Sequence, residues 1–164
     1  MTCTLFIFLI AFDQLLKIYV EKNVALNDSV TVIPNVLSFT NVHNYGAAWG
    51  SFSGYRVLLI AITLICLAVL IYVYISLNKD LNKRGKILLS LIAAGSFGNL
   101  IDRIFLGYVR DMFEVLFVDF PVFNVADIFV TLGCIAFAIL VIFVYKDRDF
   151  DFLDPRKKND ISGR

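Results

Sequence analysis

The chain has 164 residues, of which 59% are hydrophobic, and its mean hydropathy is +0.79. A soluble domain usually contains about 45–50% apolar residues, so this composition argues against a water-soluble fold and favours a membrane protein. The formal net charge of +1 offers no reason to expect a nucleic-acid partner.

Four segments are apolar enough to cross a bilayer, which requires about 20 helical residues. They cover about residues 4–20, 57–77, 87–105 and 125–145. The second and fourth are the clearest, whereas the first and third contain polar residues. A cleaved signal peptide is a less favoured interpretation of the first segment, because it lacks a basic start and a small-residue cleavage site.

The connection between the first two segments, about residues 21–56, has a character of its own. Its stretch "SVTVIPNVLSFTNVHN" is rich in β-branched and aromatic residues, and Pro34 and Asn35 form a turn signal, which predicts two short strands. The following "YGAAWGSFSGY" mixes small residues with aromatic ones, which favour the lipid–water interface.

Basic residues are concentrated on one side of the predicted membrane. Ten lie in the connection 78–86 and in the tail from residue 146, against four in the connections 21–56 and 103–124. Because basic loops remain in the cytoplasm, both termini are expected to be cytoplasmic and the two long connections to face outward. We therefore expect one membrane domain, residues 1–146. The charged tail, residues 147–164, is expected to be solvated and partly disordered.

In this orientation the polar residues of the spans gather near the outer surface, and the inner halves are almost purely apolar. Asp13 and Lys17 are four residues apart and can pair on one helix face. The other members of this layer are His43, Asn44, Asn99, Asp102, Arg103, Asp111, Asn124 and Asp127. Because polar groups in a bilayer are costly, a single layer of them predicts one site that is reached from the outer leaflet.

Asp127 is expected in the first turn of the fourth helix, where a carboxylate is favoured by the helix dipole. Helix capping is therefore one interpretation of this residue. The other is catalytic, because a second carboxylate nearby, Asp111 or Asp119, would share a proton with it and could activate water. Asp102 is expected instead to form a structural ion pair with the neighbouring arginines, Arg103 and Arg110.

Other chemistries are less favoured. Ser90 and Ser96 have no lysine or histidine at a suitable spacing, and the three cysteines lie in apolar runs, where we expect small packing residues. The cysteine spacing and the single histidine predict no metal site. Small residues of the third span, among them Gly95, Ser96 and Gly98, predict close helix packing, with room for lipid chains as the alternative.

Five blocks of this sequence resemble signal peptidase II, the lipoprotein signal peptidases of bacteria. In chain order they are "DQLLK" (13–17), "NVHNYGAAWG" (41–50), "GNLIDR" (98–103), "VRDMFEV" (109–115) and "FNVADI" (123–128). The resemblance covers about residues 10–146. It implies an integral membrane aspartic peptidase that removes the signal peptide of diacylglyceryl-modified prolipoproteins by cleaving just before the lipidated cysteine.

By motif, the resemblance implies that Asp111 and Asp127 form the catalytic pair. It also implies substrate-binding or supporting roles for Asp13, Lys17, Asn44, Gly46, Asn99, Asp102, Arg103 and Asn124. The expected fold is an all-α membrane protein with four transmembrane helices, a small extracytoplasmic β-sheet platform and an interfacial helix or loop. We expect a monomer in the bacterial inner membrane, without metal or cofactor. Trp49 and Ile128 depart from the family pattern, but neither replaces a proposed catalytic group.

Two functions of other classes remain as alternatives. One is a small transporter or proton-conducting subunit, because intramembrane acids are common in proton paths. Such a path requires polar groups at several depths, and the inner halves of these spans offer almost none. The other alternative is a structural assembly factor.

Overall fold

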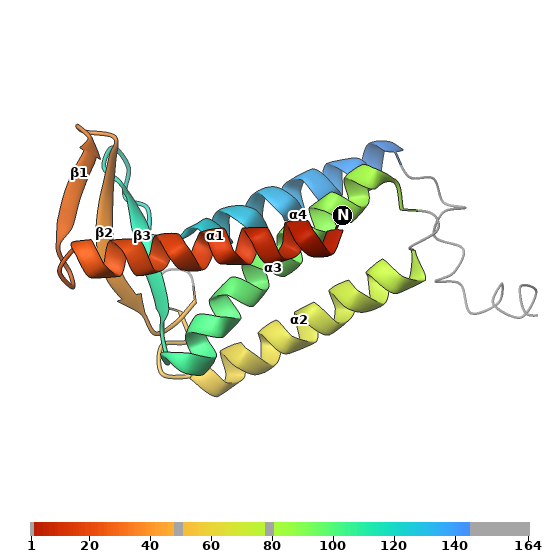
Figure 1. Ribbon diagram of the computed structural model, residues 1–164, viewed down its shortest axis with the longest axis horizontal. Coiled ribbons are helices and arrows are strands. Elements are labelled where there is room, and N and C mark those ends of the chain that lie inside the picture. The colour runs from red at the N-terminus through yellow and green to blue at the C-terminus, as the bar shows by residue number, and fades with distance from the viewer. Residues whose placement is uncertain (1, 48–50, 78–80, 145–164) are drawn as a thin grey trace, which may run out of the picture.

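The computed structural model describes residues 2–47, 51–77 and 81–144. Within these ranges four helices lie along one long axis, and a small sheet lies at one end of them, which we call the sheet end (Figure 1). The helices are α1 (Thr2–Asn23), α2 (Arg56–Ser76), α3 (Lys83–Phe105) and α4 (Val125–Val144). The predicted fold of four membrane-spanning helices with a small sheet is therefore confirmed.

Two predicted features lie outside the described residues. They are Trp49 of the aromatic segment and the charged tail, residues 147–164. The described residues on either side of Trp49 form bends at 46–47 and turns at 51–54.

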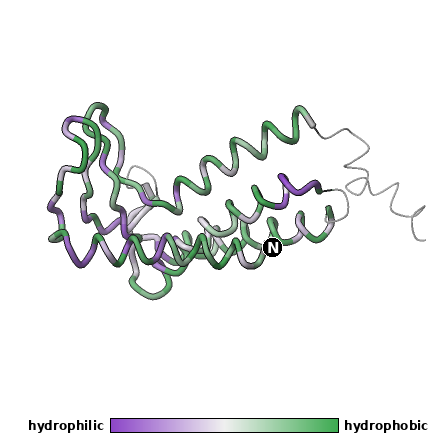
Figure 2. The backbone as a smooth tube through the Cα atoms, turned by 45° about the horizontal axis from the view of Figure 1, so that its top comes forward, coloured by the Kyte–Doolittle hydropathy of each residue, from purple (hydrophilic) through white to green (hydrophobic). Residues whose placement is uncertain are grey.

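The helices owe their form to long apolar runs. The 21 residues of α2 correspond to a length of about 32 Å, enough to cross a hydrocarbon core of about 30 Å. In α2 Leu59 is buried, and most of the other side chains are exposed apolar groups, as expected where a helix contacts lipid. Figure 2 shows hydrophobic residues along the helices and hydrophilic ones at the sheet end and at the start of α3.

The central helix is α3, which packs against each of the other three helices. Two of its glycines permit this. A Cβ atom added at Gly98 would lie 2.7 Å from Asp13 Oδ2, and one added at Gly95 would collide with Ala126 O and lie 2.9 Å from Val130 Cγ2. The predicted close packing of the third span is thus present at both positions. At the sheet end, Arg56 Nε and Nη2 donate to the carbonyl oxygens of residues 103 and 104, both at 2.7 Å.

The sheet contains three antiparallel strands in the order β1 (Ser29–Ile33), β2 (Leu37–Asn44) and β3 (Val109–Val115). The first two are the strands expected in the first long connection. The third was missed, because its sequence "VRDMFEV" carries three charged residues and becomes a strand through pairing with β2, some 70 residues away. In that pairing Val42 lies opposite Asp111 and Asn44 lies opposite Val109.

A buried network of charges joins α1, α3 and β3. Lys17 Nζ lies 2.8 Å from Asp13 Oδ2 and 3.3 Å from Asp102 Oδ2, and all three side chains are at most 1% exposed. Arg110 Nη2 lies 2.7 Å from Asp102 Oδ1. The expected Asp13–Lys17 pair is therefore present. For Asp102 the prediction was half right, since it pairs with Arg110 and Lys17, while Arg103 donates to the carbonyl oxygen of Gly46 at 3.1 Å.

We predict that Lys17→Met destabilises the fold by about 3–5 kcal/mol, because it leaves two carboxylates in a buried place with one cation fewer. Thermal unfolding of the purified protein in detergent measures this loss. Lys22→Met is the matched control, since Lys22 is exposed in the last turn of the same helix. A Lys17→Met protein that unfolds at the wild-type temperature would contradict the structural weight given to this network.

Candidate active site

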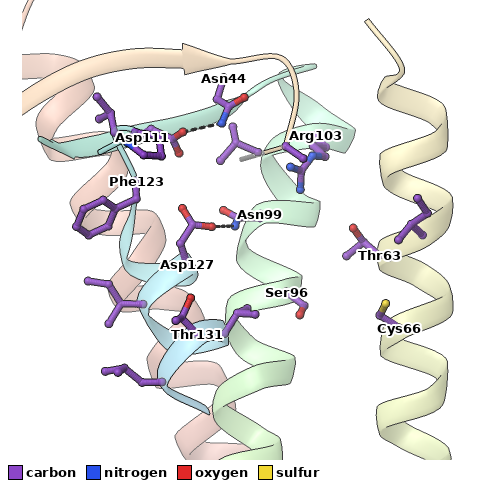
Figure 3. Close-up of a pocket in the computed structure, with 18 of the residues that line it drawn as sticks. Asn44, Thr63, Cys66, Ser96, Asn99, Arg103, Asp111, Phe123, Asp127 and Thr131 are labelled. Carbon is purple, nitrogen blue, oxygen red and sulfur yellow. Dashed lines mark hydrogen bonds between the residues drawn. The ribbon is translucent and has the colours of Figure 1, made fainter. Parts of the chain in front are cut away.

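Asp111 and Asp127 line one cavity of about 610 Å³ at the sheet end of the helices (Figure 3). Asp111 is placed there by the pairing of β3 with β2, and Asp127 by the start of α4, where it occupies the first turn. Asp119, the other carboxylate considered from the sequence, is exposed on the loop after β3 and does not belong to the described cavity lining. The two aspartates that the motifs singled out are therefore brought together.

Asp111 is buried, with 4% of its surface exposed, and two amides hold it. Asn44 Nδ2 donates to Asp111 Oδ2 at 2.9 Å, and Asn124 Nδ2 donates to Asp111 Oδ1 at 2.7 Å. Burial and then the negative charge of Asp127 raise the pKa of Asp111 to about 7, although the two amide hydrogen bonds oppose the shift. Near neutral pH this carboxyl group can therefore hold a proton or release it.

Asp127 is half-buried and is held by two N–H donors. Asn99 Nδ2 donates to Asp127 Oδ1 at 2.7 Å, and the backbone N–H of Asn124 donates to Asp127 Oδ2 at 3.0 Å. In return the backbone N–H of Asp127 donates to Asn124 Oδ1 at 3.0 Å. This reciprocal arrangement caps the start of α4. Asp127 thus has the capping role considered from the sequence and also faces the cavity.

The orientation of each asparagine amide follows from a donor on its carbonyl oxygen. Lys17 Nζ donates to Asn99 Oδ1 at 2.9 Å, and the backbone N–H of Gly46 donates to Asn44 Oδ1 at 2.8 Å. Asn124 Oδ1 accepts the helix N–H described above. Because the oxygen of each amide is occupied in this way, the NH₂ group of each one points at a carboxylate.

The remaining predicted residues lie at different distances from the cavity that contains Asp111 and Asp127. Arg103 lines the cavity. Asp13 accepts the backbone N–H of Ala126 at 2.9 Å and so holds the start of α4 from beneath. Asp102 is fully buried in the charge network instead. Gly46 contributes its backbone, as donor to Asn44 and acceptor from Arg103.

Several residues of the cavity wall were not predicted. Ile62, Thr63 and Cys66 reach it from α2, Ser96 from α3 and Thr131 from α4. Ser96 and Thr131 could have been found by helical spacing, since they lie three residues before Asn99 and four after Asp127.

The prediction for the cysteines was wrong in one respect. Cys3, Cys66 and Cys134 are exposed on the surfaces of their helices, so they are not buried packing residues. Apolar runs occur on lipid-facing surfaces as well as in cores, so the sequence pattern alone did not separate the two environments.

Comparison with known proteins decides the family. The sequence model described as Signal peptidase (SPase) II matches residues 5–143. This chain belongs to the signal peptidase II family. It is similar to the lipoprotein signal peptidase of Lactobacillus johnsonii, with 44% identity over 132 residues, which cover 80% of this chain and 85% of the relative. The lipoprotein signal peptidase of Lactococcus lactis subsp. cremoris is 40% identical over 138 residues, covering 84% and 88%.

The fold is shared as well. A solved bacterial membrane enzyme, determined by the in meso method at 2.3 Å resolution, superposes with a TM-score of 0.80 at 36% identity. The superposition covers 86% of this chain and 87% of that enzyme. Together with the four long apolar helices, this likeness makes the signal peptidase II family member described here a multi-pass membrane protein.

We predict that Asn44→Leu raises the pKa of Asp111 above about 7, because it removes a hydrogen bond that stabilises the ionised carboxylate. Infrared difference spectroscopy of the protonated carboxyl group, assigned by its absence in Asp111→Asn, follows the titration. Asn23→Leu is the control, since Asn23 donates to Tyr19 O at the end of α1, far from the pair in the chain. A titration that stays in place, or moves to lower pH, would show that Asn44 does not hold the carboxylate.

Proposed function

We propose that this protein is a membrane-embedded aspartic endopeptidase that removes the signal peptide from diacylglyceryl-modified prolipoproteins. The bond that it cleaves is the one just before the lipidated cysteine. The observation that carries the proposal is the pair of carboxylates, Asp111 and Asp127, in one cavity, each held by two N–H donors. Relatives that are themselves named lipoprotein signal peptidases support the choice of substrate.

In the proposed reaction the two carboxylates share one proton and hold a water molecule between them. The raised pKa of Asp111 favours Asp111 as the protonated partner, whose O–H polarises the scissile carbonyl group. Ionised Asp127 accepts a proton from the water as its oxygen attacks the carbonyl carbon. The C–N bond then breaks, and the leaving nitrogen takes up a proton from the pair.

The proposed setting is the bacterial cytoplasmic membrane, with both termini in the cytoplasm and the sheet end at the outer surface. The ten basic residues of the connection 78–86 and the tail from residue 146, against four in the long connections, support this orientation. Acyl chains anchor a lipidated cysteine in the outer leaflet, so its neighbouring peptide bond lies near the depth of the aspartates. Residues 1–146 form the peptidase domain in this proposal, which requires only one copy of the chain.

We predict that Asp111→Asn and Asp127→Asn each lower cleavage by about 10³-fold or more, because the pair acts as a unit. The assay uses purified protein in lipid nanodiscs, with a diacylglyceryl-modified prolipoprotein and its unlipidated twin as substrates. Asp119→Asn, on the exposed loop outside the cavity, should cleave like the wild type. Cleavage that persists in both active-site variants would exclude the mechanism, and equal cleavage of the two substrates would exclude lipid-anchored presentation. Proton flux through liposomes without any cleavage would favour the transporter alternative.

We also predict that kcat/KM falls as the pH rises through about 7, because the proposed acid, Asp111, then loses its proton. The direction follows from the raised pKa, since protonated Asp111 predominates below that value and ionised Asp111 above it. Initial rates measured between pH 5 and about pH 9 in one series of buffers at constant ionic strength test this. A rate that increases steadily over the alkaline range would mean that Asp111 is not the acid.

A further inference from the structure

The cavity continues beyond the aspartates, away from the sheet end, and two hydroxyl groups face it there. Ser96 lies on the same face of α3 as Asn99, and Thr131 on the same face of α4 as Asp127, each about one turn farther from the sheet. Figure 3 shows both side chains below Asp127 and Asn99, with Thr63 and Cys66 across from them on α2. The two hydroxyls therefore extend the polar lining of the site into the part of the helices that is otherwise apolar.

These two hydroxyls differ from those of Thr63 and Ser90 in their hydrogen bonding. A Ser or Thr hydroxyl in a helix commonly donates to a carbonyl one turn back, as Thr63 does to Leu59 O and Ser90 does to Lys86 O, both at 2.8 Å. Among the residues that the structure describes, the hydroxyls of Ser96 and Thr131 have no hydrogen-bond partner. They are therefore available to a ligand that enters the cavity.

A peptide being cut here needs such groups. The scissile carbonyl is reachable by a water molecule only if the chain around it is extended, because a helix hides its carbonyl groups in internal hydrogen bonds. Each backbone N–H or C=O released in this way costs several kcal/mol in a hydrocarbon environment unless another group binds it. An acyl chain, by contrast, has no use for hydroxyl groups. The chemistry of this wall therefore favours a peptide backbone over a lipid tail.

We propose that Ser96 and Thr131 form a subsite that binds the unwound backbone of the substrate's signal peptide next to the cleavage site. This inference rests on the proposed function and adds to it. The hydroxyls donate hydrogen bonds to the released carbonyl oxygens of the substrate and accept hydrogen bonds from its released N–H groups. The apolar walls contributed by Ile62, Ile128 and Leu132 surround the side chains of the same segment. In this arrangement the protein lowers the cost of unfolding the end of a transmembrane helix inside the bilayer.

The test compares Ser96→Ala/Thr131→Val with Ser90→Ala. Ser90 lies on the same helix as Ser96, but its hydroxyl donates to Lys86 O and it is not part of the described cavity lining, so its removal controls for the loss of a helical hydroxyl. With the diacylglyceryl-modified prolipoprotein, we expect kcat/KM of the double variant to fall about 5- to 20-fold, which corresponds to two hydrogen bonds of typical strength. Ser90→Ala should stay within about twofold of the wild type, and Thr131→Ser should retain activity. Thermal unfolding verifies that each variant is folded.

A second substrate decides what the hydroxyls bind. In it, esters replace the backbone amides of the last signal-peptide residues, which removes their N–H groups. We expect the wild type to cleave this ester substrate more slowly than the amide substrate. The double variant, which already lacks the hydroxyls, should cleave the two substrates at similar rates. Equal sensitivity of both proteins to the esters would overturn the proposal. So would a defect of the double variant that disappears when the acyl chains are shortened, because the occupant would then be lipid. If the wild type and the double variant cleave the diacylglyceryl-modified prolipoprotein equally well, this inference alone fails. If the wild type does not cleave that prolipoprotein at all, the proposed function fails.

Discussion

The architecture depends on one buried cation. Lys17 Nζ contacts Asp13, Asp102 and Asn99 at once, and so joins α1 to α3 in a place without solvent. A charge buried in this way is tolerated only when every partner is in position, so the network is satisfied in one relative placement of the helices. Asp13 extends it to the backbone of α4, and Asp102 extends it through Arg110 to β3. The elements that carry Asp111 and Asp127 are thus both connected to Lys17 through this network.

The same network sets the electrostatics of the site. Lys17 donates a hydrogen bond to the amide oxygen of Asn99, whose NH₂ group in turn donates to Asp127. The NH₂ groups of Asn44 and Asn124 donate to Asp111. For Asp111 the two amide donors favour the ionised carboxylate, while burial and the negative charge of Asp127 oppose its ionisation, and the balance places its pKa at about 7. An Asp111 carboxyl group that can hold or release a proton near neutral pH results from this opposition.

The membrane explains why the polar groups are arranged as they are. Side chains that would be costly at the middle of a bilayer are collected at the sheet end, where α3, α4 and β3 meet. The long exposed surfaces of α2 and α4 remain apolar. In the proposed function, a substrate anchored by lipid is confined to the same layer, so the protein needs no deep polar path. The hydroxyls of Ser96 and Thr131 extend the polar lining of the cavity beyond this layer, where the proposed unwound signal peptide would need hydrogen-bond partners.

The sequence by itself determined what depends on neighbours along the chain. The apolar runs define four helices, the β-branched stretch defines β1 and β2, and the spacing of Asp13 and Lys17 produces their ion pair. The motifs also singled out Asp111 and Asp127. Only the tertiary structure decided matters that join distant residues. These are the strand β3, the choice of Arg110 over Arg103 as the partner of Asp102, and the exposure of the cysteines. The physical reason is that pairing, burial and cavity shape arise from segments far apart in the chain, which local periodicity does not record.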